Sequence, residues 1–146
     1  MSKPARSSKG TTASLQEMKR SGDKITCLTA YDHLLAGLLD AAGVDLLLVG
    51  DSVGTVVQGH DTTVTVTLDQ MVYHTEMVRR GAQRALVVGD LPFLSYLVSE
   101  EDALRSSGLL LKEGTADAEK LEGGVELAPT VARLEAAGLP VMGHVG

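Results

Sequence analysis

The sequence predicts an α/β protein of the (βα)8 TIM-barrel type, of which its 146 residues supply about the first five strands and four helices. Apolar runs without polar alternation recur along the chain, which is typical of strands buried on both faces of a parallel sheet. Segments with helical periodicity separate these runs, and the repeat is about 24–38 residues long, the size of one βα unit. The composition, 44% apolar and 22% charged, is that of a folded domain.

Each repeat begins with a glycine-containing helix end, continues with an apolar run and closes with a polar or acidic residue. The glycines are Gly43, Gly81, Gly114 and Gly138, and we expect each in the left-handed conformation that ends helices. The runs that follow them predict four strands. Ile25–Ala30 is the expected opening strand, which brings the number to five.

Four helices are expected between the strands, and three of their starts carry capping residues. Asp32 can cap the first helix, which bears a stripe of leucines. Thr67–Gln70 has the spacing of a capping box and starts the second. Ser99 precedes three acidic residues, which the helix dipole favours in the first turn of the third. Val125–Ala137 is the expected fourth helix. Strict alternation of strand and helix indicates a parallel sheet with right-handed crossovers.

Two architectures share this alternation: an open doubly wound sheet and a (βα)8 barrel. Five strands could form a complete flavodoxin-like domain. However, the sequence ends directly after the expected strand within Val141–Gly146, with no helix to cover it. No glycine-rich phosphate-binding pattern follows the first strand, which argues against nucleotide binding. Because a full barrel needs about 250 residues, we expect residues 24–146 to be the N-terminal part of a barrel domain.

Residues 1–23 differ from the rest and predict an N-terminal tail that leads into a short helix at about Ala13–Ser21. Met1–Thr12 is rich in Ser, Lys and Gly and lacks the apolar stretch of a secretory signal, although an organelle transit segment has a similar composition. We expect a cytoplasmic location. The single cysteine, Cys27, fits a reducing compartment and excludes a disulfide within the chain, and we expect its side chain to be buried.

Charge and composition argue against two classes of partner. The chain carries 19 acidic and 13 basic residues, a formal charge of −6, whereas nucleic-acid binding needs a basic face. Three tyrosines and one phenylalanine are too few for a base-stacking surface. No apolar run approaches the roughly 18 residues that a membrane span needs. We therefore expect neither nucleic acid nor membrane as a partner.

Polar residues stand at the carboxyl ends of three expected strands, where parallel α/β folds carry their sites. They are Asp51 with Ser52, then Asp90, then Lys120 and Glu122, the last two sharing one face of a regular strand. Converging carboxylates repel one another unless a cation lies among them, and oxygen ligands without His or Cys favour Mg²⁺ over zinc. An acid after a strand is also a common helix cap, but three in register with Ser and Lys favour a site.

The same residues lie in motifs that resemble one known family. The resemblance is to ketopantoate hydroxymethyltransferase, and it runs from about Thr12 to the last residue. Several independent motifs in the same order carry it: Thr29-Ala-Tyr-Asp32, Val49-Gly-Asp-Ser52, Val57-Gln-Gly-His-Asp61, Tyr73-His74 with Val78-Arg-Arg-Gly81, Asp90-Leu-Pro-Phe93, Lys120-Leu-Glu-Gly-Gly124 and Pro140-Val-Met-Gly-His-Val-Gly146. Related magnesium barrels that act on phosphoenolpyruvate or isocitrate are a weaker alternative, because they would not explain the Gly59-His-Asp61 motif.

The resemblance implies a Mg²⁺-dependent (βα)8 barrel that assembles into large homo-oligomers, commonly decamers. It implies transfer of a hydroxymethyl group from the co-substrate 5,10-methylenetetrahydrofolate to 3-methyl-2-oxobutanoate, giving 2-dehydropantoate for pantothenate biosynthesis. Carried over by motif, the metal ligands would be Asp51, Asp90 and Glu122, and the substrate contacts Asp51, Ser52, Asp90 and Lys120. The chemistry is consistent, because a small 2-oxo acid can chelate Mg²⁺ and the metal, with Lys120 beside it, would stabilise the enolate formed at C3.

The chain departs from the family pattern in two ways that matter for function. The family's catalytic base is a glutamate beyond the last residue here, so no catalytic residue is assigned and the 146-residue segment alone is expected to be inactive. A non-catalytic half-barrel that binds metal or pairs with another chain is the alternative. Glu119 stands where the family usually has an apolar strand residue, so it either faces outward or is a local flaw of the strand. His144 is a second-layer residue of the site, a helix cap or a polar residue with a satisfied contact.

Overall fold

The computed structural model describes residues 8–146, so residues 1–7 of the expected tail lie outside it. The described residues form five strands, six α-helices and one 3-10 turn. In chain order they are α1 (Thr12–Arg20), β1 (Cys27–Thr29), α2 (His33–Ala41), β2 (Leu46–Val49), α3 (Val53–Val56), α4 (Leu68–Gly81), β3 (Leu86–Asp90), α5 (Glu100–Lys112), β4 (Ala118–Glu122), η1 (Val125–Leu127), α6 (Ala128–Ala136) and β5 (Val141–His144).

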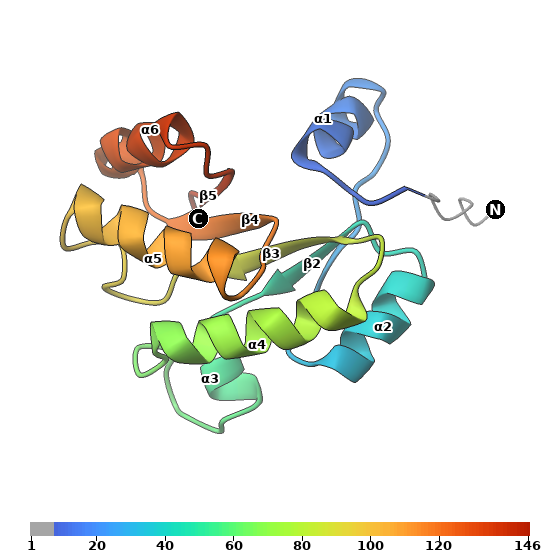
Figure 1. The fold of residues 1–146 in the computed structure, drawn as a ribbon, viewed down its shortest axis with the longest axis horizontal. Coiled ribbons are helices and arrows are strands. Elements are labelled where there is room, and N and C mark those ends of the chain that lie inside the picture. The colour runs from blue at the N-terminus through green and yellow to red at the C-terminus, as the bar shows by residue number, and fades with distance from the viewer. Residues whose placement is uncertain (1–7) are drawn as a thin grey trace.

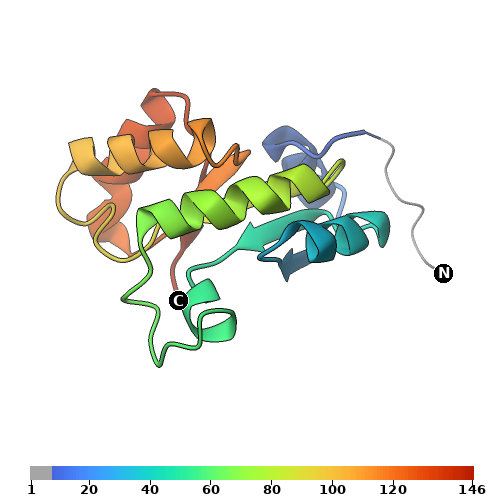
Figure 2. The ribbon, with the colours of Figure 1, turned by 60° about the horizontal axis from the view of Figure 1, so that its bottom comes forward.

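The five strands form one parallel sheet in the order β1-β2-β3-β4-β5. Figures 1 and 2 show α4 and α5 lying over one face of this sheet, with α2 beside α4 and α6 beside α5. A doubly wound sheet would reverse its strand order and carry helices on both faces. The sequential order, with the helices α2, α4, α5 and α6 on one side of the sheet, is that of a barrel wall, and it confirms the predicted fold type.

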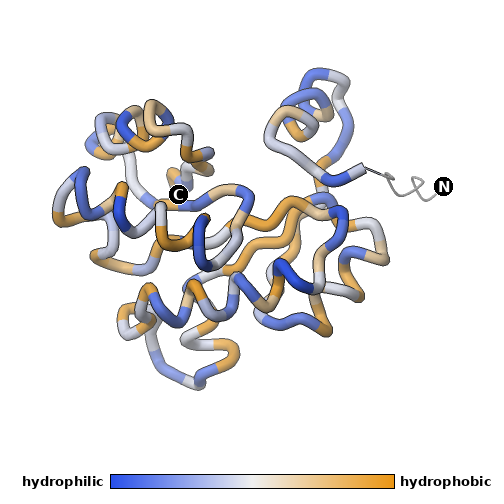
Figure 3. The backbone as a smooth tube through the Cα atoms, in the orientation of Figure 1, coloured by the Kyte–Doolittle hydropathy of each residue, from blue (hydrophilic) through white to orange (hydrophobic). Residues whose placement is uncertain are grey.

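The sheet has two chemically different faces. The helix-covered face carries most of the core, in which strand residues such as Leu47, Val87 and Leu121 pack against the four covering helices. The opposite face, here called the inner face, has a small apolar cluster of Leu46, Leu86, Val88 and Ala118, against which Leu15 of α1 packs. Figure 3 shows the apolar strands in the middle of the molecule. Since side chains alternate along a strand, Asp90 and Lys120 also belong to the inner face.

The helix starts follow the capping signals in the sequence. Asp32 accepts a hydrogen bond from the Leu35 backbone at 2.8 Å, and Thr67 and Gln70 form a reciprocal capping box with distances of 2.8 and 3.2 Å. Ser99 accepts from the Asp102 backbone at 3.1 Å. Two details differ from expectation: the short helix α3 follows β2, and the fourth expected helix divides into η1 and α6.

Two of the four glycines expected in the left-handed conformation do not adopt it. Gly43 and Gly138 have φ of 93° and 85°, as expected, but Gly81 and Gly114 have no positive φ. Gly81 is the last residue of α4, and a Cβ on it would lie 2.4 Å from the His33 carbonyl oxygen. Position 81 therefore requires glycine because α2 and α4 approach each other closely there, and not because the chain makes a turn.

The edges of the sheet are β1 and β5. Cys27 of β1 is exposed, which corrects the expectation of a buried cysteine, because an edge strand lacks a neighbour on one side. Leu28 beside it is 48% exposed. Among the described residues, none of the helices is long and apolar enough to span a bilayer.

Candidate functional site at the carboxyl ends of the strands

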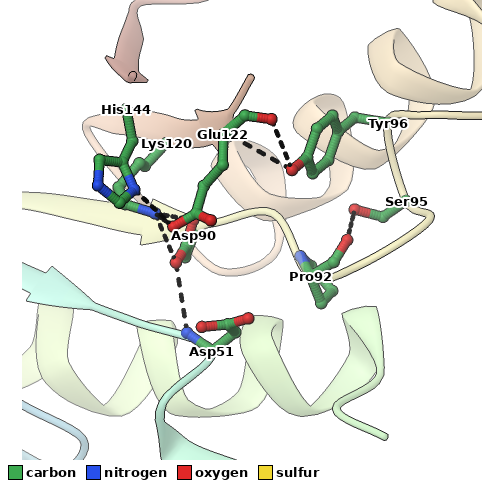
Figure 4. Close-up of polar contacts among 8 residues, drawn as sticks. All are labelled: Asp51, Asp90, Pro92, Ser95, Tyr96, Lys120, Glu122 and His144. Atoms are coloured by element: carbon green, nitrogen blue, oxygen red, sulfur yellow. Dashed lines mark hydrogen bonds and ion pairs between the residues drawn. The ribbon is translucent and has the colours of Figure 1, made fainter. Parts of the chain in front are cut away.

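The strand register brings the predicted polar residues to one end of the sheet. Asp90, the last residue of β3, pairs with Lys120 of β4, and Glu122 pairs with His144 of β5. Asp51 lies two residues beyond the end of β2, on the neighbouring strand. Figure 4 shows Asp51, Asp90, Lys120 and Glu122 gathered around one point. The three acidic residues therefore lie at one end of the sheet, with Lys120 beside Asp90 and Glu122, and Asp51 contacts Asp90 through its backbone N–H.

Lys120 is the centre of this arrangement. Its Nζ donates hydrogen bonds to both oxygens of Asp90, at 2.8 and 2.9 Å, and to Oε1 of Glu122 at 2.9 Å. The side chains of Lys120 and Asp90 are 10% and 5% exposed, whereas that of Glu122 is 54% exposed. The Asp51 backbone N–H donates to Asp90 at 3.4 Å. The result is a buried ion pair with a second, half-exposed carboxylate at its rim.

Burial and pairing act against each other on these groups. Burial raises the pKa of Asp90 to about 6, although the Lys120 ammonium lowers it. Burial lowers the pKa of Lys120, but the hydrogen bonds and charges of Asp90 and Glu122 outweigh it, so the net shift is upward. The bonds from Lys120 and His144 lower the pKa of Glu122. Lys120 is therefore protonated and positively charged. For Asp90, the stabilising effect of the Lys120 charge on the ionised carboxylate is smaller than the destabilising effect of burial.

Two residues complete the polar cluster that the strand-end pattern only partly indicated. His144 Nδ1 lies 2.7 Å from Glu122 Oε1, so this histidine contacts the rim carboxylate rather than a helix end. The Tyr96 hydroxyl donates to the Glu122 carbonyl oxygen at 3.1 Å and accepts from its N–H at 3.3 Å. Tyr96 lies between β3 and α5 in the segment where Leu94 has φ 68°, and no sequence signal singled it out.

Ser52, the remaining predicted residue, has a different environment. Its hydroxyl lies 2.8 Å from the Tyr31 hydroxyl, and the Tyr31 carbonyl oxygen lies 2.8 Å from Nδ1 of His74. Tyr31 and His74 belong to two of the motifs that carried the family resemblance, yet neither was predicted as a site residue. The structure connects both to Ser52.

A cavity of about 130 Å³ opens beside the ion pair. Asp51, Asp90 and Glu122 provide its polar side, and the remaining lining residues are Thr63, Val64, Leu91, Phe93 and Tyr96. Within residues 8–146, no group of three or more His, Cys, Asp or Glu side chains is arranged to hold a metal ion. In this structure Lys120 bridges Asp90 and Glu122 instead.

Glu119 lies on the helix-covered face of β4, directly next to Lys120 in sequence. It points away from the inner face, as expected, but toward α5 rather than toward solvent, and it is 0% exposed. Neither carboxylate oxygen has a hydrogen-bond partner, and the nearby Ser107 hydroxyl of α5 has none either. Burial raises the pKa of Glu119 to about 7. Of the two expectations for Glu119, the outward-facing side chain is therefore wrong, whereas a local flaw of the strand agrees with its buried, unbonded carboxyl group.

Comparison with known sequences identifies one family. The family model for ketopantoate hydroxymethyltransferase matches residues 9–146. A 3-methyl-2-oxobutanoate hydroxymethyltransferase of Chloroflexus aurantiacus is 55% identical over 136 residues, covering 93% of this chain and 48% of that protein. One of Syntrophus aciditrophicus is 51% identical over 146 residues, covering 100% of this chain and 54% of that protein. The chain thus spans about half the length of the curated relatives it matches.

Comparison with solved structures supports the fold. A phosphonopyruvate hydrolase structure superimposes with a TM-score of 0.73 at 14% identity, covering 90% of this chain and 50% of that one. A 2,3-dimethylmalate lyase, of the PEP mutase/isocitrate lyase superfamily, gives 0.65 at 19% identity, covering 90% and 51%. At these identities the likeness concerns the fold alone. It identifies the five-stranded sheet as part of a barrel of this type.

Proposed function

The chain belongs to the ketopantoate hydroxymethyltransferase family, and we propose that it forms the metal- and keto-acid-binding part of a barrel that transfers a hydroxymethyl group. The acceptor is 3-methyl-2-oxobutanoate, the donor is 5,10-methylenetetrahydrofolate and the product is 2-dehydropantoate. The observation that supports this best is the Lys120–Asp90 pair, which lies with Asp51 beside one small cavity at the strand ends. We further propose a cytoplasmic homo-oligomer.

The donor set suits a hard divalent cation. Asp51 and Asp90 present carboxylate oxygens to the same cavity, and Mg²⁺ is usually held by one or two carboxylates together with water and substrate oxygens. Asp90 is buried with a raised pKa, so additional positive charge beside it would stabilise its ionised form. Glu122, the third proposed ligand, is bonded to Lys120 and His144 and would add negative charge on the side of these two residues. Bound Mg²⁺ would supply positive charge to the carbonyl oxygen of the keto acid.

The side chains that line the cavity, together with Lys120 bonded to Asp90 and Ser52 next to Asp51, have complementary tasks toward a 2-oxo acid. The Lys120 ammonium stands beside Asp90, where it can stabilise negative charge that develops on the keto oxygen when a proton leaves C3. The Ser52 hydroxyl can donate to the substrate carboxylate. Val64 and Phe93 line the cavity near these polar groups and can contact the branched alkyl end. No described residue is assigned as the base that takes the C3 proton.

A second candidate function follows from the exposed edge of the sheet. Leu28 of β1 and Leu34 and Leu38 of α2 are 48%, 72% and 61% exposed, an apolar surface that a neighbouring βα unit would cover. On this alternative, the chain is a non-catalytic half-barrel that pairs with another polypeptide there. The two candidates differ in one respect: only the first requires the cavity to bind the keto acid in a metal-dependent manner.

Titration calorimetry separates the two candidates. Adding 3-methyl-2-oxobutanoate to the chain in the presence of MgCl₂ should give a saturable heat that is absent without MgCl₂. Asp90→Asn should abolish it, because one charged ligand and the partner of Lys120 are lost together. Glu135→Gln removes an exposed acid on α6 and should bind like the wild type. Metal-independent binding, or unchanged binding by Asp90→Asn, would contradict the assignment.

The isolated 146-residue chain should produce no 2-dehydropantoate from the folate donor and the keto acid. It holds no assigned base, and general-base catalysis typically supplies about 10²–10⁴-fold in rate. Measurable product from purified, sequence-verified protein would show that a base lies within residues 1–146, with His144 the first residue to test.

A further inference from the structure

We propose that Tyr31 is a positioning residue of the site: it fixes the Ser52 hydroxyl over Gly50, beside Asp90, so that the hydroxyl pair presents one hydrogen to an anionic oxygen of the substrate. This rests on the function proposed above, which gives Ser52 a contact with the keto acid but gives Tyr31 no role. Three observations support it: the local approach of Ser52 to Gly50, and two contacts between segments that are far apart in sequence, Tyr31 with Ser52 and Tyr31 with His74.

The first contact places Ser52. A Cβ built on Gly50 would lie only 2.8 Å from Ser52 Oγ, so the hydroxyl occupies the space of the missing side chain at position 50. Val49 pairs with Gly89, and continuing this register places position 50 beside Asp90. Since Leu46 belongs to the inner face, position 50 belongs to it as well. The Ser52 hydroxyl therefore reaches the same layer as the Asp90–Lys120 pair.

The second and third contacts hold Ser52 there. The Tyr31 hydroxyl lies 2.8 Å from Ser52 Oγ and comes from the segment after β1. The Tyr31 ring packs against the main core, and its carbonyl oxygen lies 2.8 Å from Nδ1 of His74 in α4. The segment is fixed further because Asp32 caps α2. Tyr31 is thus a rigid support built from the core, whereas a serine alone could turn about χ1.

The hydroxyl groups of Tyr31 and Ser52 together can donate one hydrogen bond to a ligand. Each hydroxyl carries one hydrogen, and one of the two is used between Tyr31 and Ser52. The other is left for an acceptor, and when Tyr31 is the donor this free hydrogen is on Ser52, polarised by the bond that Oγ accepts. A carboxylate oxygen is the acceptor that matches it best. Without the tyrosine hydroxyl, Ser52 can satisfy itself by turning toward nearby backbone, as serine commonly does.

Calorimetry with 3-methyl-2-oxobutanoate and MgCl₂ tests the assignment through Tyr31→Phe, which keeps the ring and its packing. We expect the Kd for the keto acid to rise roughly tenfold, the size expected for a lost bond that supports a charged acceptor. Thermal unfolding should change little. Tyr73→Phe is the matched control, because Tyr73 is 60% exposed on α4 and its hydroxyl has no hydrogen bond to another residue of the described chain.

A double-mutant cycle distinguishes positioning from a general structural role. If Tyr31 acts through Ser52, then Tyr31→Phe should cost nothing further in a Ser52→Ala background. Fully additive losses, or a Tyr31→Phe protein that binds like the wild type, would overturn the proposal while leaving the proposed function intact.

If the wild-type chain binds no keto acid with MgCl₂, the proposed function fails, and crystal structures still decide the role of Tyr31. In Tyr31→Phe the Ser52 hydroxyl should leave its place over Gly50. A hydroxyl that stays there would contradict the proposal.

Discussion

Glu119 and Lys120 are consecutive residues of β4, yet they show two different outcomes of burying a charge. Lys120 projects to the inner face, where two carboxylates accept its hydrogen bonds. Glu119 projects to the helix-covered face, where neither of its oxygens is bonded. The pKa of Lys120 is raised, which favours its charged form. The pKa of Glu119 is raised to about 7, which favours its neutral form. Burial of a charged residue alone therefore does not indicate a functional site. The presence of hydrogen-bonded partners of opposite charge does.

The two faces of β4 also differ in what they contribute: the inner face contributes residues to the candidate site, and the helix-covered face contributes to the core. The inner face joins residues of β3, β4 and β5 with the segment that follows β2 into one cluster, which is what a binding site at the end of a barrel requires. On the other face, Glu119 is flanked in the sheet by Gly89 and Val141 and faced by Ser107, so no charged residue from these elements compensates it. Glu119 is a local cost to stability with no visible gain.

The largest expected effect comes from breaking the paired side. Lys120→Met should destabilise the chain by about 3–5 kcal/mol near pH 8, because it leaves Asp90 buried and uncompensated. Urea unfolding gives the value. Lys112→Met is the matched control, since Lys112 is exposed at the end of α5 and should change stability by less than about 0.5 kcal/mol. Equal effects of the two substitutions would show that the ion pair does not hold the inner face.

A smaller effect of opposite sign is expected on the unpaired side. Burial raises the pKa of Glu119 from 4.5 to about 7, so the folded state binds a proton that the unfolded state has released in this range. The stability of the wild type therefore falls as pH rises from about 4.5 to about 7 and levels off above. Glu119→Leu should remove this loss and stabilise the chain at pH 8 by on the order of 2 kcal/mol.

The pH dependence makes this second test specific. The gain from Glu119→Leu should shrink toward pH 4, where Glu119 is protonated in both states. Glu113→Gln alters an exposed acid just after α5 and should leave the pH profile unchanged. A gain that is the same at pH 4 and pH 8 would mean that volume, rather than charge, decides the cost of Glu119.

The smallest expected effect is that of Ser107→Ala on the pKa of Glu119, on the helix-covered face. The Ser107 hydroxyl faces Glu119 without a hydrogen bond of normal geometry, and its proximity lowers the pKa of Glu119 against the larger, opposite effect of burial. Ser107→Ala should therefore move the folded-state pKa of Glu119 further up, and the upper end of the stability loss should move to higher pH. Unfolding measured between pH 5 and pH 9 would detect the shift. An unchanged profile would indicate that the hydroxyl does not reach the carboxyl group.

The residues of the site that sequence reasoning found all lie at strand ends. Asp90, Lys120 and Glu122 could be predicted because the carboxyl ends of parallel strands meet at one edge, and their spacing fixes the face they share. Tyr31 and Tyr96 could not be predicted, because they reach the cluster from irregular segments whose path depends on tertiary packing.

The fold was predictable to a similar extent and for similar reasons. Strand and helix alternation, together with capping residues, predicted the barrel type and the helix starts. The requirement for glycine at position 81 arises from the contact between α2 and α4, which lies outside any local pattern. The face of Glu119 followed from strand alternation, but its complete burial depends on how closely α5 covers β4.

A crystal structure of the chain with 3-methyl-2-oxobutanoate and MnCl₂ in place of MgCl₂ would show whether one cavity holds both the metal and the keto acid. The proposed function predicts one anomalous peak in the cavity, within ligand distance of carboxylate oxygens of Asp51 and Asp90, with the keto acid beside Lys120 and Ser52. A metal or keto acid bound elsewhere, or a cavity that stays without either at saturating concentrations, would contradict it.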